Sequence, residues 1–342
     1  MAATPHELIE TPDRSADVLA GVLATIRLSG ALQFAFEPCG AWQSDTTLPL
    51  ATLSARMPGI MPFHIVVEGD CWLTFDGETR AVEAGDVLVF PFADGHRLGS
   101  GRGGQTVSPM VELPPQPWSA LPVMQYGDED AERVRILCGF VSIGAMGFAP
   151  LRHAMPRLIH INTRGANDAD WLGTMIRQMM AEIDSRRPGS LTMLERLTEL
   201  VFLELLRLRI VNREKGITGW LAALADPALG RCLALVHTEP ERAWTVETMA
   251  SQSGLSRTAL ADRFVALLGT TPMRYVRDWR LYLASVALTT TTQPIAAIGF
   301  AAGYGTEAAF NRAFARAYGM PPAAWRQQAT EGTARLGSAF ND

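Results

Sequence analysis

Cysteine, lysine and long apolar runs are scarce in this sequence, and each shortage excludes a class of protein. Four cysteines in 342 residues, without any Cys-x-x-Cys spacing, are too few for a disulfide scaffold, so reduced thiols are expected. No apolar run is long enough to span a bilayer, and the first residues lack the basic and apolar segments of a secretion signal. We therefore expect a cytoplasmic protein with no membrane partner.

Signatures of common catalytic chemistry are also missing. The chain has no Gly-x-Ser-x-Gly, no phosphate-binding loop and no dinucleotide fingerprint, and its glycine-rich run at 99–104 lacks the Lys-Ser/Thr ending of a phosphate loop. That run is interpreted as a loop between strands. The sequence does not indicate an enzyme, and no cofactor is expected.

Lysine occurs only at Lys215, and the net charge of −5 argues by itself against binding to nucleic acid. The charge is unevenly distributed, because residues 231–329 hold ten arginines against six acidic residues, a balance of +4 that leaves −9 for the rest. The planar fork of arginine suits phosphate oxygens. The C-terminal part is therefore the candidate for binding double-stranded DNA.

A helix-turn-helix pattern is present in this basic part. A short apolar helix from Ile295 precedes a Gly-Tyr-Gly break at 303–305, and Thr306 can cap a new helix. Phe310 and Phe314 lie four residues apart and supply the buried face of that second helix. The segment therefore predicts two helices joined by a tight turn.

The same pattern occurs about fifty residues earlier. Gly254 supplies the break, Ser256 the cap, and Leu260 with Phe264 the buried pair. Between the copies, residues 272–288 begin with a proline and carry apolar residues along one side, which predicts a rigid connecting helix. A repeated unit is far more specific than a single match.

The C-terminal hundred residues resemble the double helix-turn-helix DNA-binding domain of AraC/XylS-type transcription regulators. The resemblance rests on glycines, prolines and apolar residues together: Trp244, Leu255 to Arg257, Leu260, Phe264, Gly269 to Pro272, Trp279, Arg280, Ile298, Gly303, Tyr304, Ala309, Phe310, Arg312, Phe314 and Gly319 to Arg326. It implies a bacterial regulator that binds promoter DNA as a homodimer and contacts RNA polymerase.

The second helix of each unit is expected to lie in the major groove and to present its outward residues to the bases. Arg312 can chelate guanine, Asn311 can pair with adenine, and Asp262 can accept from a cytosine amino group. The alternative is that these residues only form a solvated polar face of each helix. The candidate DNA-binding residues are Arg257, Thr258, Ala261, Asp262, Thr306, Glu307, Ala308, Asn311 and Arg312.

The N-terminal half has a β pattern after a predicted amphipathic helix over 15–28. Short strands are expected over 32–36, 63–67, 71–75, 79–82, 86–90 and 135–141, separated by glycine and proline turns. This spacing is typical of a jelly-roll barrel, and residues 60–150 resemble the cupin sensory domain of one AraC-type subgroup. The expected fold class is therefore α+β and multidomain, with a cupin-like β-barrel and an all-α C-terminal domain.

Helices are expected between these two parts. Residues 168–183 and 191–211 carry apolar residues at helical spacing, and Trp171 is expected on the apolar side of the first helix. The second helix either is buried within one chain or forms a dimer. The expected division is a sensory domain at 1–160, a helical linker and dimerisation region at 161–228, the DNA-binding domain at 229–329, and a disordered tail at 330–342.

The barrel offers His64, Trp72 and His96 as a candidate ligand pocket for a small-molecule effector. His64, Glu68 and His96 are weak candidates for a metal triad, because the second of the two paired histidines found in metal-binding cupins is missing. A structural role is favoured and no bound metal is expected. The alternative is a metal-dependent cupin enzyme or a cupin small-molecule-binding protein with an accessory helical domain.

Two cysteines are candidates for oxidant sensing. Cys39 lies in a turn, and Cys138 resembles a Cys-Gly pair in the cupin subgroup, some of whose members sense reactive chlorine. One hypothesis is a Cys39–Cys138 disulfide, or a sulfenic acid at Cys39, that changes DNA affinity. The alternative is that Cys138 is an inert core residue, since a cysteine within a strand usually is.

Overall fold

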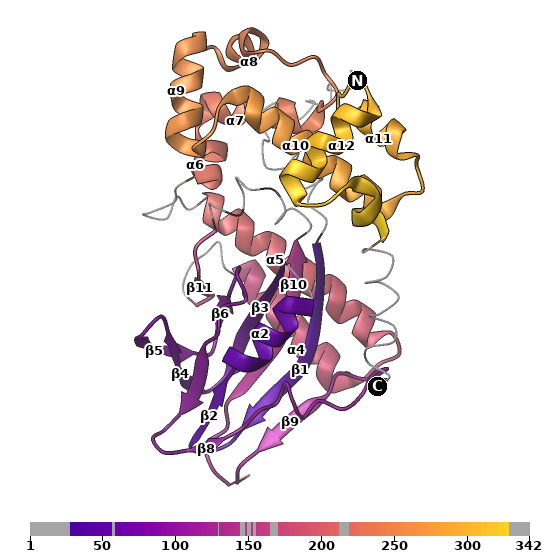
Figure 1. The fold of residues 1–342 in the computed structure, drawn as a ribbon. Coiled ribbons are helices and arrows are strands. Elements are labelled where there is room, and N and C mark those ends of the chain that lie inside the picture. The colour runs from indigo at the N-terminus through magenta and orange to yellow at the C-terminus, as the bar shows by residue number, and fades with distance from the viewer. Residues whose placement is uncertain are drawn as a thin grey trace, which may run out of the picture.

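The computed structural model describes residues 28–56, 59–128, 130–143, 148, 152, 155–164, 170–211 and 219–327. Figure 1 shows two β-sheets at the lower end of the molecule, a helical hairpin beside them, and a group of helices at the upper end. The predicted helix over 15–28 lies outside the described residues, except for Leu28, which begins the first strand. No helix of the described part is long and apolar enough to cross a membrane.

The N-terminal part consists of two sheets, in agreement with the predicted jelly roll, although neither sheet closes on itself as a barrel. Strands from distant parts of the chain alternate within each sheet, as in a jelly roll. The six-stranded sheet has the order β11 (Ile159–Asn162), β6 (Asp86–Val89), β3 (Ile60–Glu68), β10 (Arg135–Ile143), β1 (Leu28–Pro38) and β9 (Val123–Tyr126). The five-stranded sheet has the order β5 (Glu78–Glu83), β4 (Asp70–Phe75), β7 (Arg97–Ser100), β2 (Trp42–Asp45) and β8 (Gln105–Thr106).

Alternation along the strands builds two cores on opposite faces of the six-stranded sheet. In β10, Ile136 and Cys138 belong to the core between the sheets, whereas Leu137 and Val141 belong to the core on the outer face. The period of two side chains in a strand produces this separation. His64 of β3 is paired in register with Cys138, so it too points between the sheets.

Three helices accompany the sheets: α2 (Thr47–Arg56), α4 (Asp170–Ser185) and α5 (Ser190–Val211). The outer core joins α4 and α5 to the six-stranded sheet, and α5 approaches β1 so closely that a Cβ on Gly30 would lie 2.7 Å from Thr198. Trp171 was expected on the apolar side of α4 but is 58% exposed. It lies just outside the buried face of the helix, which begins at Leu172. The inner face of α5 is therefore buried within one chain.

The C-terminal helices are α6 (Gly219–Ala225), α7 (Pro227–Thr238), α8 (Val246–Ser253), α9 (Arg257–Leu268), α10 (Pro272–Thr290), α11 (Ile295–Ala301) and α12 (Glu307–Tyr318). One core joins α6 to α9 with the first part of α10, and a second core joins the last part of α10 to α11 and α12. The long helix α10 thus connects two small helical units, as the sequence predicted.

Candidate functional site

The first helix-turn-helix unit is formed by α8 and α9. Thr245 and Thr248 cap α8 reciprocally, and Gly254 ends the helix in the left-handed region at φ 66°. The Ser256 hydroxyl then accepts a hydrogen bond from the Ala259 amide and starts α9. Since the buried residues of α9 are Leu260 and Phe264, its opposite side is left to solvent.

The second unit, α11 and α12, repeats this construction. Thr306 caps α12 by accepting from the Ala309 amide, and Phe310 and Phe314 form its buried face. Gly299 of α11 lies directly against Phe310, where an added Cβ would approach the ring to 2.9 Å. Phe300 of α11 is 58% exposed, although it belongs to the apolar helix that the sequence predicted from Ile295.

The candidate base-reading residues of the first unit lie at the start of α9. Arg257, Thr258 and Asp262 are exposed, and Ala261 is partly covered. Arg257 forms an ion pair with Glu247 of α8 at 2.9 Å. A DNA phosphate or base would have to compete with that carboxylate for the guanidinium.

In the second unit, Thr306, Glu307, Ala308 and Arg312 are exposed, and Arg312 makes no ion pair within the part of the chain that the structure describes. Asn311 differs from expectation, because its Oδ1 is buried without a hydrogen-bond partner. The residue as a whole is half-buried. Arg312 is therefore the best placed of the predicted residues for contact with a base.

Two arginines among the residues that carry the family resemblance hold the helices together. Arg280 donates through Nε to the carbonyl of Pro240 and through Nη2 to that of Arg242. Arg326 donates to the carbonyls of Leu288 and Gln293. Because both side chains satisfy backbone acceptors at the ends of helices, they position the two units and are not free for DNA.

Between the two sheets, His64, His96 and Cys138 form one buried hydrogen-bonded chain. His64 Nδ1 lies 3.1 Å from Cys138 Sγ, and its Nε2 lies 2.7 Å from Nε2 of His96. Nδ1 of His96 lies 3.0 Å from the carbonyl oxygen of Asp94. Burial lowers the pKa of His96 to about 4 and lowers that of His64 well below its usual value, so both rings are neutral near pH 7.

The hydrogen-bond partners of His64, His96 and Cys138 determine which atom carries each proton. A carbonyl only accepts, so Nδ1–H of His96 donates to Asp94 and its Nε2 must accept. Nε2–H of His64 then donates to His96, which leaves Nδ1 of His64 as the acceptor of the Cys138 S–H. Each of these three side chains is hydrogen-bonded, and the thiol proton faces the unprotonated Nδ1 of His64.

These three hydrogen-bonded side chains lie beside a small cavity of about 30 Å³ between the sheets. Its polar lining comes from Gln33, Ser44, Thr46, His64 and Cys138, and its apolar lining includes Phe34, Phe36, Leu50, Leu98 and Met110. Met110 also borders an open groove of about 810 Å³ along α2. It therefore separates the inner cavity from that groove.

Two predicted members of the barrel site lie elsewhere. Trp72 is on the other face of β4, where it covers Gly99 and donates to the Gly101 carbonyl at 3.3 Å. Glu68 ends β3 and forms an exposed ion pair with Arg133. Glu68 therefore does not join His64 and His96, the other two weak candidates for a metal triad, and in the described residues no three His, Cys, Asp or Glu side chains are grouped to hold a metal.

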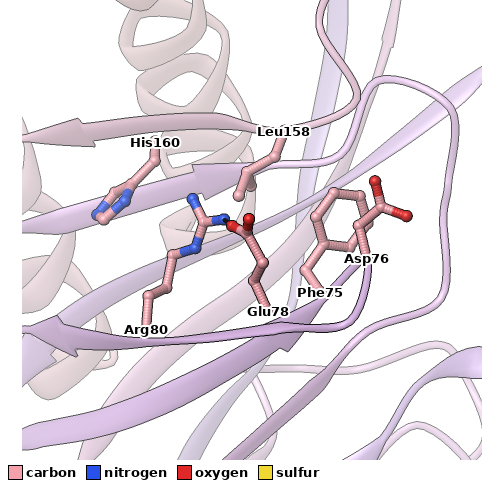
Figure 2. Close-up of a pocket in the computed structure, with 6 residues that line it drawn as sticks. All are labelled: Phe75, Asp76, Glu78, Arg80, Leu158 and His160. Atoms are coloured by element: carbon pink, nitrogen blue, oxygen red, sulfur yellow. Dashed lines mark hydrogen bonds and ion pairs between the residues drawn. The ribbon is translucent and has the colours of Figure 1, made fainter.

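A separate groove of about 320 Å³ lies between the β4–β5 hairpin and β11 (Figure 2). Its charged groups already have partners: Arg80 pairs with Glu78 at 2.9 Å, and Asp76 pairs with Arg157 at 2.9 Å. Because both pairs are exposed, water screens them and the groove carries little uncompensated charge.

The structure contradicts the proposed Cys39–Cys138 disulfide. Cys39 is bridged to Arg133, whereas Cys138 is paired with Phe34 and His64. The register thus separates the two thiols by five residues along β10, roughly 17 Å, far beyond disulfide geometry. Burial also raises the pKa of Cys138 and raises that of Cys71 to about 12.

The chain resembles known proteins over both parts. The profile of the cupin family matches residues 17–210, and that of a helix-turn-helix domain matches residues 249–328. An AraC-like transcription regulator of Streptomyces lividans is 29% identical over 334 residues, covering 92% of this chain and 99% of that protein.

A second relative, the HTH-type transcriptional regulator AlkR of Acinetobacter baylyi, is 28% identical over 267 residues, covering 78% of this chain and 87% of that protein. Among solved structures, the DNA-binding domain of the transcriptional factor AdpA in complex with a target DNA is 26% identical, with a TM-score of 0.29. The match covers 30% of this chain and 92% of the AdpA domain.

Proposed function

The chain belongs to the AraC family of transcription regulators, within the group that carries an N-terminal cupin domain, and on that premise we propose that α9 and α12 read promoter DNA under the control of the two-sheet domain. One observation supports this proposal best. The second helix of each helix-turn-helix unit is capped and faces solvent, and α10 joins the two units. Such helices enter successive major-groove segments about 34 Å apart. The relatives are regulators, which does not favour the rival function of a cupin enzyme.

Arg312 provides the test of DNA recognition. We expect Arg312→Ala to lower affinity for the promoter by about 1 to 3 kcal/mol and to relax discrimination at one base position. Fluorescence anisotropy with the promoter and with random duplex measures both quantities. Arg102→Ala, which removes an exposed arginine from the sheet domain, is the control for the change in net charge.

Equal losses on promoter and random DNA would make Arg312 a phosphate contact instead of a base contact. Absence of any DNA affinity at low salt in the parent protein would contradict the assignment of α9 and α12 as reading helices. Binding that does not weaken with rising salt would contradict it too, since phosphate contacts release counterions.

The exposed face of the α4–α5 hairpin supports a second element of the proposal, a homodimer. Met193 and Leu200 are about half exposed on α5, and Trp171 is exposed on α4. Apolar side chains grouped on helices that already cover a core favour a self-complementary contact. We expect Leu200→Glu to shift the protein from dimer to monomer in sedimentation equilibrium, whereas Leu48→Glu on α2 does not. A monomeric parent would contradict the proposal.

The two-sheet domain is the proposed sensor. Its cavity contains hydrogen-bonding groups in an otherwise apolar lining, which is the usual construction of a small-molecule site. The outer face of the same sheet packs on α4 and α5, and the core there continues into the first helix-turn-helix unit. A change at the cavity therefore has a continuous packed route to the DNA-reading helices.

A further inference from the structure

We propose that the cavity beside Cys138 captures a small uncharged aldehyde, which the thiol binds reversibly as a hemithioacetal. The inference rests on the sensory role proposed above and adds to it a ligand class and a reacting atom. Three observations carry it: the thiol lines the cavity, a neutral imidazole accepts the thiol proton, and the cavity is very small.

The hydrogen bonds around Cys138 match the chemistry of carbonyl addition. Sγ attacks the carbonyl carbon while Nδ1 of His64, 3.1 Å away, takes the thiol proton and returns it to the new alkoxide oxygen. One S–C bond forms, the C=O double bond becomes a C–OH single bond, and no co-reactant is needed. The same steps in reverse release the aldehyde.

His96 acts as a positioning residue for this step. It accepts the Nε2–H of His64 at 2.7 Å and is itself held by the Asp94 carbonyl. These contacts fix His64 in the tautomer whose Nδ1 can accept from the thiol. They also give both ring nitrogens of each buried histidine a hydrogen-bond partner.

The size and polarity of the cavity select the ligand. Its volume is about 30 Å³. A single water needs on the order of 10 to 15 Å³ by this measure, so about two or three heavy atoms fit. An ion would lose its hydration without meeting an opposite charge, because the polar lining is neutral. Formaldehyde, with two heavy atoms and no charge, meets both conditions.

Other reactive molecules fit the site less well. A small oxidant such as hypochlorous acid has a suitable size, but its reaction with the thiol releases chloride into an apolar cavity. The register excludes Cys39 as a partner for a disulfide. Addition of the thiol to an aldehyde releases no ion and requires no second cysteine.

The test uses the full-length protein with Cys39→Ser, because the partly exposed Cys39 would otherwise form its own adduct. Carbon-13 formaldehyde is added in phosphate buffer without amines, and the bound carbon is followed by NMR together with intact mass. We expect one hemithioacetal signal that disappears on dilution. It should be absent in Cys138→Ser and Cys138→Ala and retained in Cys71→Ser.

A purely structural role of the histidine is distinguished by the rate. His64→Gln keeps the thiol and removes the base, so adduct formation should slow by roughly 100-fold, the low end of general-base effects. No adduct in the parent, or equal adduct in Cys138→Ser, overturns the proposal. A sulfenic or sulfinic acid at Cys138 formed by hypochlorite, without any formaldehyde adduct, would assign the site to an oxidant. Promoter binding of the same samples separates this outcome from failure of the DNA-binding assignment.

Discussion

Among the residues that the structure describes, three imidazoles are buried and are kept neutral by their surroundings: His64, His96 and His237. His237 lies in the core of the first helix-turn-helix unit, where Trp220 donates to the Tyr275 hydroxyl and that hydroxyl can donate to Nε2 of His237. Burial lowers the pKa of His237 to about 3. Protonation of this ring is therefore coupled to unfolding.

The free energy of unfolding should therefore decrease as the pH is lowered. The unfolded chain binds a proton at each histidine near pH 6.5, whereas folded His237 stays neutral down to about pH 3. The stability is full above pH 6.5 and is lost as pH falls toward 3, by about 2 kcal/mol at pH 5 for this group alone. Urea unfolding between pH 7.5 and 5 measures it. We expect His237→Gln to be less stable at pH 7.5 but to show a shallower decline, and an unchanged slope would contradict the assignment.

Single residues show where sequence reasoning reaches its limit. Leu260, Phe264, Phe310 and Phe314 were predicted to be buried, and all four are, because the helical period alone sets their face. Oδ1 of Asn311 is buried, whereas the prediction placed the side chain outward. Trp72 does not line the cavity. It lies between two inward residues of β4, so a strict use of alternation would have excluded it from the pocket.

At the scale of elements, capping and glycine placement explain why the helix-turn-helix units were predictable. The caps Ser256 and Thr306 and the left-handed glycines are local signals that need no knowledge of the rest of the fold. Strand register is not local. The pairing of Cys138 with His64, and the distance of Cys39 from both, depend on which strands meet in the sheet.

Close packing of α11 on α12 leads to a prediction for Gly299. An added methyl group would approach Phe310 to 2.9 Å, so Gly299→Ala should force the two helices apart and destabilise the second unit by about 1 to 3 kcal/mol. The affinity for the promoter and the melting temperature should both decrease. Gly305→Ala is the matched control, because its methyl group meets nothing within 4 Å. Equal effects of the two substitutions would show that the packing argument is wrong.

At the scale of the whole molecule, the sheet domain and the first helix-turn-helix unit share one core. Figure 1 shows α5 between the sheets and the upper helices. Phe148, which follows β10 in the chain, is buried among aromatic residues of the C-terminal part. The sequence predicted a sensory domain and a DNA-binding domain joined by a helical linker, but only the tertiary arrangement reveals this contact between the two domains.

The position of Phe148 predicts how the two parts unfold. Its ring lies 5.3 Å from Tyr275, 5.1 Å from Trp279 and 6.3 Å from Trp220, measured between centroids. Removing a buried phenylalanine costs about 3 to 5 kcal/mol, and here the loss falls on the contact between two domains. We expect Phe148→Ala to turn one thermal transition into two, followed by tryptophan fluorescence and calorimetry, while Phe92→Ala, which removes an exposed ring, leaves one transition. If Phe148→Ala unfolds in a single step at the parental temperature, the two domains are not coupled through this residue, and a signal from the cavity must reach α9 through α5 and α6 instead.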